Sequence, residues 1–562
     1  MISTRSTPKP FPWQFILFGC VIFWIKPAEA QVAVQIGQNF TGSTYSVNTA
    51  ASPADSNGAI GPRHFMEFIN GTVAVYNKTN GMSVQRKTNL KFWSDAGVII
   101  SADSAVSDPR VIYDPSVQRW FALQIDFDYN AAANGLDYLT EQNDFLFAVS
   151  ATSDPTGQWR GFLFQSDPDT GGFADFPTLG VDANAVYLAG DFFRGETVPL
   201  GSGLVSIPKT DLLASTPTVA NRTWFGLMSH TNRGQVLQPA ICFDGSSSGN
   251  ILAMGDIGND SDPHSNMVSF AVQNAGSTNP TLTAAASLNV PAYVVPFNSD
   301  LGYPLFNPVQ PDGTTTLQAN DARLSAQVHA VAGSLYAVHN TEFNGRVAIR
   351  WYRIGAPNHV VLESGTIADP ALDLFFPSIA ANTNGTIVVA CNGSSMNTFV
   401  SCFAVVGQTV NGVTAFGDLV LLKAGVANYH DGNEILAQLL NDPVVDSRWG
   451  DYSATSVDPS DPTHFWTIQM YASGESESVG IWSTQVTELL TIASPTLSIT
   501  RSGPDVVVSW PVASGGFNLE SNTNIASTNS WTPITSTFST NNGRVQFQTS
   551  LTNQATFFRL RK

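Results

Sequence analysis

The chain is poor in charged residues, and basic residues are the scarcer kind. Only 12% of its 562 residues are Asp, Glu, Lys or Arg, about half of the ~25% usual in soluble globular proteins. The 26 basic residues face 44 acidic ones, so the formal net charge is −18, and no stripe of Lys and Arg offsets it. Such a chain repels phosphate backbones, which excludes DNA and RNA as partners.

Long hydrophobic runs are also missing, apart from one near the N-terminus. The run Phe15–Ile25 has eleven apolar residues, about half of the ~20 needed to cross a bilayer. Two basic residues precede it, and Ala28-Glu29-Ala30 follows with the small-x-small pattern of a signal-peptidase site. We therefore expect residues 1–30 to be a signal peptide. The mature chain would be secreted (extracellular, at the cell surface or periplasmic), without a membrane span.

Cysteine is rare as well. Of the four cysteines Cys20 leaves with the signal peptide, so Cys242, Cys391 and Cys402 remain. Cys391 and Cys402 flank a loop between two strand-like runs, which would allow a disulfide across a hairpin. The alternative is that both are small buried apolar residues. A zinc site would need a fourth nearby ligand, and the sequence offers none.

The sequence repeats one pattern seven times. A short apolar strand and a polar turn precede a second apolar run, which in six of the seven copies closes on Asp or Asn. With a mean period of about 67 residues and further strand-like runs after each hairpin, each copy has room for four strands. The second runs are 65–70, 121–126, 186–191, 251–256, 335–340, 387–392 and 465–470.

These repeats predict an all-β protein: a seven-bladed β-propeller over residues 31–490, followed by a small β-sandwich over residues 495–562. Either Val32–Gln38 or Phe40–Ser46 would complete the last blade. The alternative, a long array of β-sandwiches, does not explain the paired hairpins. One short helix is expected at 433–440. The C-terminal part differs in charge, with five basic and two acidic residues after position 490.

Three stretches carry a resemblance to known proteins: 57–64 (NGAIGPRH), 108–120 (DPRVIYD…RW) and 448–459 (RWGDYS…VDP). In them the chain resembles secreted bacterial β-propeller proteins of unassigned activity, a resemblance that brings no catalytic residues with it. The tail, with Val508-Ser509-Trp510-Pro511, looks like the immunoglobulin- or fibronectin-III-like modules of secreted bacterial proteins. That likeness implies spacing or attachment.

One rim of the propeller is the expected binding face. In a hairpin the start of the first strand lies beside the end of the second, so acidic residues at those positions share a rim. The long insertions, such as 127–144, 291–323 and 423–448, fall on the same rim, and long loops are uncommon unless functional or disordered. The residues predicted to bind there are Asp108, Arg110, Asp175, Arg448 and Asp451.

The same rim raises the question of a metal. Asp126, Asp191 and Asp256 end three of the second runs, and carboxylate oxygens are the ligands that Ca²⁺ takes. The competing explanation is that Asp and Asn at strand ends bond nearby backbone amides and form turns. Both interpretations stay open in the sequence.

Enzyme motifs are missing too. There are no repeated Asp boxes of the sialidase type, no His-Glu-x-x-His and no Gly-x-Ser-x-Gly elbow. We therefore expect a secreted, monomeric binding or structural protein that recognises an extracellular glycan or protein. The alternative is a hydrolase or lyase acting on extracellular polysaccharide at the same channel mouth. Acidic and arginine side chains converging in a deep pocket would favour the enzyme.

Overall fold

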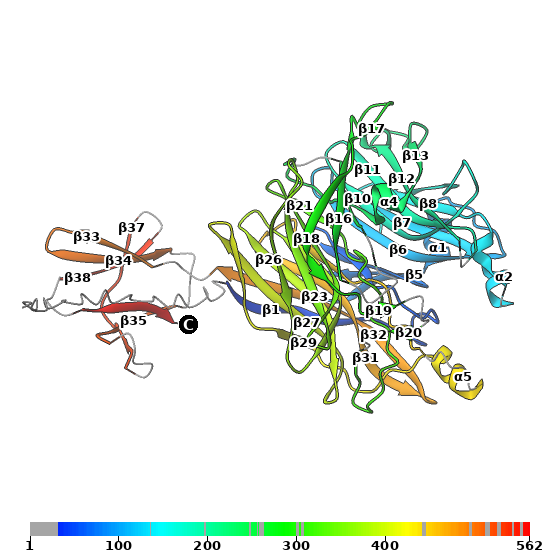
Figure 1. Cartoon of the computed structure of the whole chain (residues 1–562). Coiled ribbons are helices and arrows are strands. Elements are labelled where there is room, and N and C mark those ends of the chain that lie inside the picture. The colour runs from blue at the N-terminus through cyan, green and yellow to red at the C-terminus, as the bar shows by residue number, and fades with distance from the viewer. Residues whose placement is uncertain are drawn as a thin grey trace, which may run out of the picture.

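The computed structural model is nearly all β (Figure 1). It describes residues 32–134, 136–195, 198–246, 249–255, 257, 263–298, 303–304, 308–440, 446–493, 497–511, 517–524, 530–541, 544–550 and 555–561. The predicted signal peptide and Asp256 lie outside these residues. Within them, no helix has the length and apolar character needed to cross a membrane.

Seven antiparallel sheets of four or five strands follow one another along the chain. The first four are β2–β5 (Asn57–Ile60, His64–Ile69, Thr72–Asn77, Ser83–Thr88), β6–β9 (Ser104–Asp114, Arg119–Asp128, Asp144–Ser150, Trp159–Gln165), β10–β13 (Phe173–Val181, Ala185–Phe193, Pro199–Pro208, Thr223–Met228) and β14–β18 (Gln235–Pro239, Asn250–Met254, His264–Gln273, Thr281–Leu282, Ala286–Tyr293).

The remaining three sheets complete the series. They are β21–β24 (His329–Val331, Ser334–Phe343, Arg346–Gly355, Val360–Ile367), β25–β29 (Asp373–Ala381, Thr386–Ser395, Thr398–Val410, Val413–Phe416, Val420–Lys423) and β30–β32 (Ala454–Val457, His464–Ser476, Val479–Ala493) with β1 (Val32–Thr44). A two-stranded ribbon, β19 (Phe297–Asn298) and β20 (Tyr303–Pro304), lies between the fourth and fifth sheets in sequence.

The sheets form a closed ring around a central channel. The first strand of each sheet contacts the first strand of the next, and β30 contacts β2 to close the circle. Between the fourth and fifth sheets the link is a bridge of Ile241 with His329. Later strands of each sheet lie successively farther from the channel, which is the architecture of a β-propeller.

The N-terminal segment completes the seventh sheet. β1 pairs antiparallel with β32, from Val32 opposite Ala493 to Thr44 opposite Ser483, so the prediction that this segment closes the last sheet is confirmed. Glu67 on β3 fastens the joint: it accepts hydrogen bonds from the Ser43 amide and hydroxyl and from the Thr484 hydroxyl. Because Glu67 is fully buried, these bonds replace its lost hydration.

The core lies between neighbouring sheets. Phe121 and Phe147 of the second sheet pack with Leu179 and Leu188 of the third, all of them at most 1% exposed. Full burial of one such side chain stabilises the fold by roughly 1.5–3 kcal/mol. The second strands are buried on both faces and are mainly apolar, which explains why the sequence shows them as repeated apolar runs.

Four first strands contain one residue with left-handed backbone near the channel mouth. Asp108, Phe176, Val236 and Phe376 have φ between +47° and +60°, and each lies where the pairing register shifts. Left-handed backbone is unfavourable for such residues, so the surrounding structure must hold it.

Side chains at the ends of the preceding second strands stabilise three of these left-handed residues by accepting hydrogen bonds from their backbone amides. The side-chain oxygens of Asn70, Asp191 and Asn340 accept hydrogen bonds of 3.0, 3.2 and 3.1 Å from the amides of Asp108, Val236 and Phe376. Each bond joins one sheet to the next, so we call it the inter-sheet clasp. The closing Asp or Asn of the repeat therefore has a structural role at these three positions.

Helices are few and short: α1 (Asn89–Asp95), α2 (Tyr129–Ala133), the 3-10 turn η1 (Tyr138–Thr140), α3 (Lys209–Leu212), α4 (His230–Arg233) and α5 (Gly432–Leu440). The helix α5 confirms the one helix expected from the sequence. α2 and η1 occupy the long connection from β7 to β8.

The C-terminal part contains two small antiparallel sheets (Figure 1): β33 (Ser498–Ser502), β34 (Asp505–Pro511), β38 (Arg544–Ser550) and β37 (Ser539–Asn541) in one, and β36 (Thr532–Pro533), β35 (Asn518–Asn522) and β39 (Phe557–Arg561) in the other. Val508 and Trp510 from the first sheet and Leu519 from the second share a hydrophobic cluster of their own.

The predicted disulfide between Cys391 and Cys402 does not form. Both are free, buried thiols. The register places Cys391 opposite Phe403 and Cys402 opposite Asn392 on the neighbouring strands β26 and β27. Since successive side chains alternate between faces, the two sulfurs lie on opposite faces of the sheet and cannot be bridged. The alternative, two small buried apolar residues, is the correct one.

Candidate functional site

The channel mouth on the side of the long connections opens into a cleft of about 640 Å³, here called the acidic cleft. Its lining carries four carboxylates and an arginine, contributed by separate parts of the ring: Asp55, Asp108, Asp175, Asp451 and Arg448. Aromatic residues from β7, β10, α2 and η1 line the same cleft: Phe127, Phe173, Tyr129 and Tyr138. The cleft therefore combines charged and aromatic side chains.

Asp55 and Asp451 are joined through the backbone. The Asp451 amide donates to Asp55 Oδ1 at 2.9 Å, and Asn70 Nδ2 donates to Asp55 Oδ2 at 2.7 Å. Burial, followed by the charges of Asp451 and Asp108, raises the pKa of Asp55 well above its ordinary value. The surroundings of Asp55 therefore disfavour its charged form.

Asp451 is held as an ion pair. Arg448 Nη2 donates to Asp451 Oδ2 at 2.8 Å, while Asn320 Nδ2 donates to Oδ1 at 2.9 Å. Asp451 is the largest of several causes that raise the pKa of Arg448. The Asp451 carboxylate is thus ion-paired to Arg448, oriented by two donors and placed at the cleft.

Asp108 lies deeper, at 8% exposure. It accepts hydrogen bonds of 2.9 Å from the Tyr452 hydroxyl and of 2.9 Å from the Ser107 hydroxyl. Burial and then Asp451 raise its pKa, and burial and then Asp108 raise the pKa of the Tyr452 phenol. Asp108 lines the cleft, and the buried Tyr452 holds it there from behind.

Asp175 has the pKa best matched to acid–base chemistry at neutral pH. It lies on β10 opposite Asp191 of β11 and is only half-buried. Burial, followed by the charge of Asp108, raises its pKa from 3.8 to about 7, although Arg323 opposes the rise. A carboxyl group that is protonated near pH 7 and still reaches a cleft can donate a proton to a bound molecule.

Arg110 is not a rim residue, which corrects the sequence prediction. It is 1% exposed and does not line the cleft. Its Nε donates to the Pro177 carbonyl at 2.8 Å, and its guanidinium carbon lies 3.4 Å from the centre of the Tyr452 ring. The left-handed turn at Asp108 and the stacking on Tyr452 hold Arg110 beneath the cleft. The other four predicted binding residues are brought together.

Asp126 and Asp191, the two predicted metal ligands that the structure describes, do not come together in a group of metal ligands. Asp126 Oδ1 accepts from the Asp144 amide at 2.7 Å, and Asp126 lines a cavity of about 310 Å³ that adjoins the acidic cleft. Burial raises the pKa of Asp126 to about 6. Asp191 forms an inter-sheet clasp and also accepts from the Ser202 hydroxyl at 2.6 Å. Both carboxylates therefore already have backbone partners.

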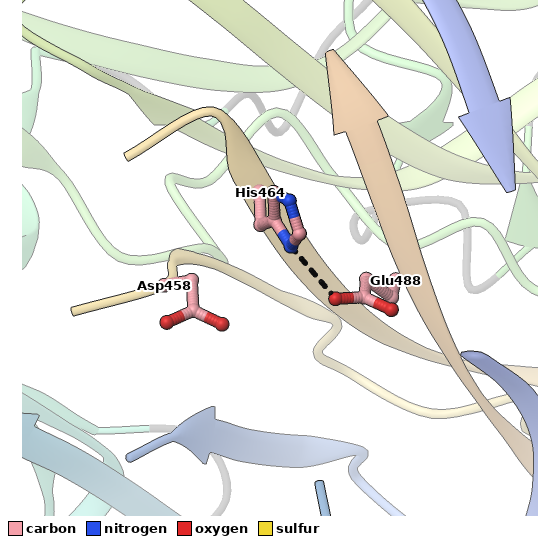
Figure 2. A group of neighbouring side chains, drawn as sticks. All are labelled: Asp458, His464 and Glu488. Carbon is pink, nitrogen blue, oxygen red and sulfur yellow. Dashed lines mark hydrogen bonds and ion pairs between the residues drawn. The ribbon is translucent and has the colours of Figure 1, made fainter. Parts of the chain in front are cut away.

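Another group of side chains has the spacing of metal ligands. Ligand atoms of Asp458, His464 and Glu488 lie within 4.8 Å of one another. Figure 2 shows His464 bonded to Glu488, with Nδ1 2.9 Å from Oε1, and Asp458 beside them without a bond to either. Lys78 Nζ lies 2.6 Å from Asp458 Oδ2 and donates to Oδ1 at 2.7 Å. Because an ammonium group already neutralises Asp458, we assign no metal here.

Sequence reasoning missed Asp55, Tyr129, Tyr138 and Arg323. Asp55 had a usable signal, since it precedes the first strand of its sheet at a short distance, as Asp451 precedes β30. The aromatic residues lie in an insertion without a repeat pattern. Arg323 comes from a segment whose place beside Phe176, with the guanidinium carbon 4.7 Å from the ring centre, only the folded chain reveals.

Comparisons with known proteins give no family. No family model matches the sequence, and no curated protein matches it either. Many solved structures match the chain. The chain is similar to a protein of unknown function from Dyadobacter fermentans (9% identity, 74% of this chain and 92% of that one, TM-score 0.33). It is also similar to extracellular domains 1–2 of Drosophila Semaphorin 1b (8%, 80% and 86%, 0.34) and to a GH43 endo-arabinanase from Bacillus licheniformis (10%, 66% and 99%, 0.28). At these identities and TM-scores nothing about the site follows.

Proposed function

We propose that this protein is a secreted seven-bladed β-propeller that binds an extracellular polysaccharide in the acidic cleft and hydrolyses its glycosidic bonds. In this proposal residues 31–490 form the propeller, and residues 495–562 form an immunoglobulin- or fibronectin-III-like β-sandwich that attaches or spaces it. One observation favours an enzyme over a binding protein: several carboxylates and an arginine converge in one cleft. These residues are Asp55, Asp108, Asp175, Asp451 and Arg448.

The mixed lining of the cleft suits a sugar chain. Aromatic rings present flat apolar faces to the C–H side of a sugar ring, and the exposed Tyr129 offers such a face at the cleft edge. The carboxylates of the lining accept hydrogen bonds from hydroxyl groups. A cavity of this kind, with apolar and convergent polar walls, is the usual form of a ligand site.

Two carboxyl groups take the two roles that glycoside hydrolysis needs. Asp175, with its raised pKa, is the proton donor to the leaving oxygen. Asp451, ion-paired to Arg448 and hydrogen-bonded by Asn320, is the charged carboxylate that acts as base or nucleophile. Asp55 and Asp108 position Asp451 and set the charge of the cleft.

The test combines binding and turnover. The mature chain is screened on a glycan array and on a panel of neutral and anionic polysaccharides, with release of reducing ends as the readout. We expect Asp175→Asn and Asp451→Asn to bind the polysaccharide that the wild type cleaves, and to lower its turnover at least a hundredfold. The matched control is Asp418→Asn, an exposed carboxylate between β28 and β29.

The other outcomes decide between the remaining readings. Binding without any cleavage by the wild type would support the non-catalytic alternative, a propeller that recognises an extracellular glycan or protein. Cleavage that yields an unsaturated product, seen by its ultraviolet absorbance, would identify a lyase. Full activity in both cleft variants would refute the assignment of the site.

A further inference from the structure

Two long connections meet beside the acidic cleft. Residues 312–320 come from the connection between the fourth and fifth sheets, and residues 446–451 lead into the seventh sheet. An isolated β-bridge and two backbone hydrogen bonds of 2.9 Å join the two segments. The first segment ends at Asn320, which orients Asp451, and the second carries Arg448 and Asp451 into the cleft. Whatever fixes these segments therefore also fixes the charged residues of the cleft.

The side chain of His430, just before α5, lies between two carboxylates. Its Nε2 is 2.8 Å from Asp312 Oδ2, and its Nδ1 is 2.9 Å from Glu434 Oε2. Because an ionised carboxylate only accepts, both ring nitrogens donate and the ring carries a positive charge. The bond to Glu434 is the largest cause that raises the pKa of His430 to about 9. We call Asp312, His430 and Glu434 the histidine clamp.

Glu434 and its neighbour Asp431 connect the histidine clamp to the cleft segment. The fully buried Glu434 accepts from the Ser447 hydroxyl. The Asp431 amide donates to Ser447 Oγ at 2.7 Å, and Asp431 Oδ2 accepts from the Arg448 amide at 3.0 Å. The backbone that presents Arg448 to the cleft is thus held by two carboxylates, one of which is bonded to His430.

The positive charge of His430 is needed where it lies. Burial, with the charge of Glu434 as a smaller cause, raises the pKa of Asp431, so the two carboxyl groups oppose each other. Within the described residues, His430 is the cation that pairs with Glu434, since Arg448 pairs with Asp451 instead. A buried carboxylate that loses its cationic partner is strongly destabilising. Removal of His430 should therefore loosen the contacts that Glu434 makes.

We propose that His430 is a positioning residue for the acidic cleft. By donating to Asp312 and Glu434 it holds the two segments together, and so fixes Arg448 and Asp451 where they meet a bound molecule. The role of His430 in turnover rests on the function proposed for the cleft, whereas its role in fixing the cleft does not.

The first test is hydrogen–deuterium exchange of the mature chain at pH 7, read by mass spectrometry. The amides of Ser447, Arg448 and Asp451 are the reporters, because each donates to a partner within the fold. His430→Phe keeps a ring but removes both donors, and should speed exchange in 446–451 and 312–320 about tenfold. His430→Arg restores two donors and the charge, and should return exchange to within about threefold of the wild type.

The matched control is His464→Phe. It removes a similar bond, from His464 Nδ1 to Glu488 Oε1 at 2.9 Å, at the end of the seventh sheet away from the cleft. It should leave exchange in 446–451 unchanged. Asp312→Ala removes one half of the histidine clamp at an exposed position, and should speed exchange about threefold even if His430→Phe fails to fold. Unchanged exchange in His430→Phe and Asp312→Ala, or equal acceleration in the Phe and Arg variants, would overturn the proposal.

The second test uses the polysaccharide that the wild type cleaves. His430→Phe should lower kcat about tenfold and leave KM nearly unchanged, because a displaced Asp451 still binds but is misaligned for the reaction. His430→Arg should restore kcat. Faster exchange with an unchanged kcat would overturn the positioning role and leave His430 a purely structural residue. No turnover by the wild type would refute the function proposed for the cleft, while the exchange comparison would still decide whether His430 fixes it.

Discussion

The pKa of Asp175 leads to a measurable dependence of stability on pH. The pKa is 3.8 in an ordinary environment and about 7 in the folded protein, with burial as the first cause and the charge of Asp108 as the second. The folded state therefore favours the protonated carboxyl. Its contribution to stability is complete below about pH 4 and is lost as the pH rises through about 7.

The size of the effect follows from the same numbers. Each unit between the two pKa values corresponds to about 1.4 kcal/mol, so Asp175 contributes up to ~4 kcal/mol. This is an upper bound, since Asp175 is only half-buried. Asp175→Asn has nearly the same shape as the protonated side chain and does not ionise. Between pH 4 and pH 8 the stability of the variant relative to the wild type should therefore rise by one to ~4 kcal/mol.

The measurement is urea unfolding of both proteins at pH 4, 6 and 8, followed by tryptophan fluorescence. Asp418→Asn serves as the control, because it removes a carboxylate from an exposed position. The control should keep the pH dependence of the wild type. A constant difference between Asp175→Asn and the wild type across the pH range would refute the raised pKa and, with it, Asp175 as the proton donor.

Three further tests address other parts of the molecule. Glu67→Ala should lower the free energy of unfolding by roughly 3–5 kcal/mol, because it leaves the buried Ser43 and Thr484 hydroxyls without their acceptor. A loss below about 1 kcal/mol would contradict this. Millimolar Ca²⁺ should raise the Tm if Asp191 ligates a cation, whereas the clasp predicts no response and a loss of about 1–3 kcal/mol in Asp191→Ala. Limited proteolysis should cut near 494–496 and leave the ring intact if the two parts fold separately; protection there would count against two domains.

The repeat was predictable because of where its strands lie. The apolar runs found in the sequence are the second strands of the seven sheets, which are buried on both faces and so consist mainly of apolar residues, with Glu67 and Gln124 as buried exceptions. The closing strand β1 was predicted for a related reason, since the last sheet lacked a strand. The positions of the strands along the chain and the order of the sheets follow from such local patterns.

The cleft was predicted in part, and the part that failed depends on distant contacts. Asp108, Asp175 and Asp451 follow from strand order, because the start of each first strand faces the channel mouth. Arg110 follows Asp108 by two residues and was assigned to the same rim. Its burial depends on Tyr452, which comes more than 300 residues later, so no local pattern carries that information.

The acidic residues of the ring fall into two groups that the sequence does not separate. Carboxylates and amides that close the second strands, such as Asp191 and Asn70, accept bonds from backbone amides and hold the next sheet in place. Carboxylates on or before the first strands, such as Asp175 and Asp451, reach the cleft instead. Composition counts both groups alike, which is why the sequence left a calcium site open beside the turn. Their chemistry differs because the first group has fixed backbone partners, whereas the second group meets whatever enters the channel.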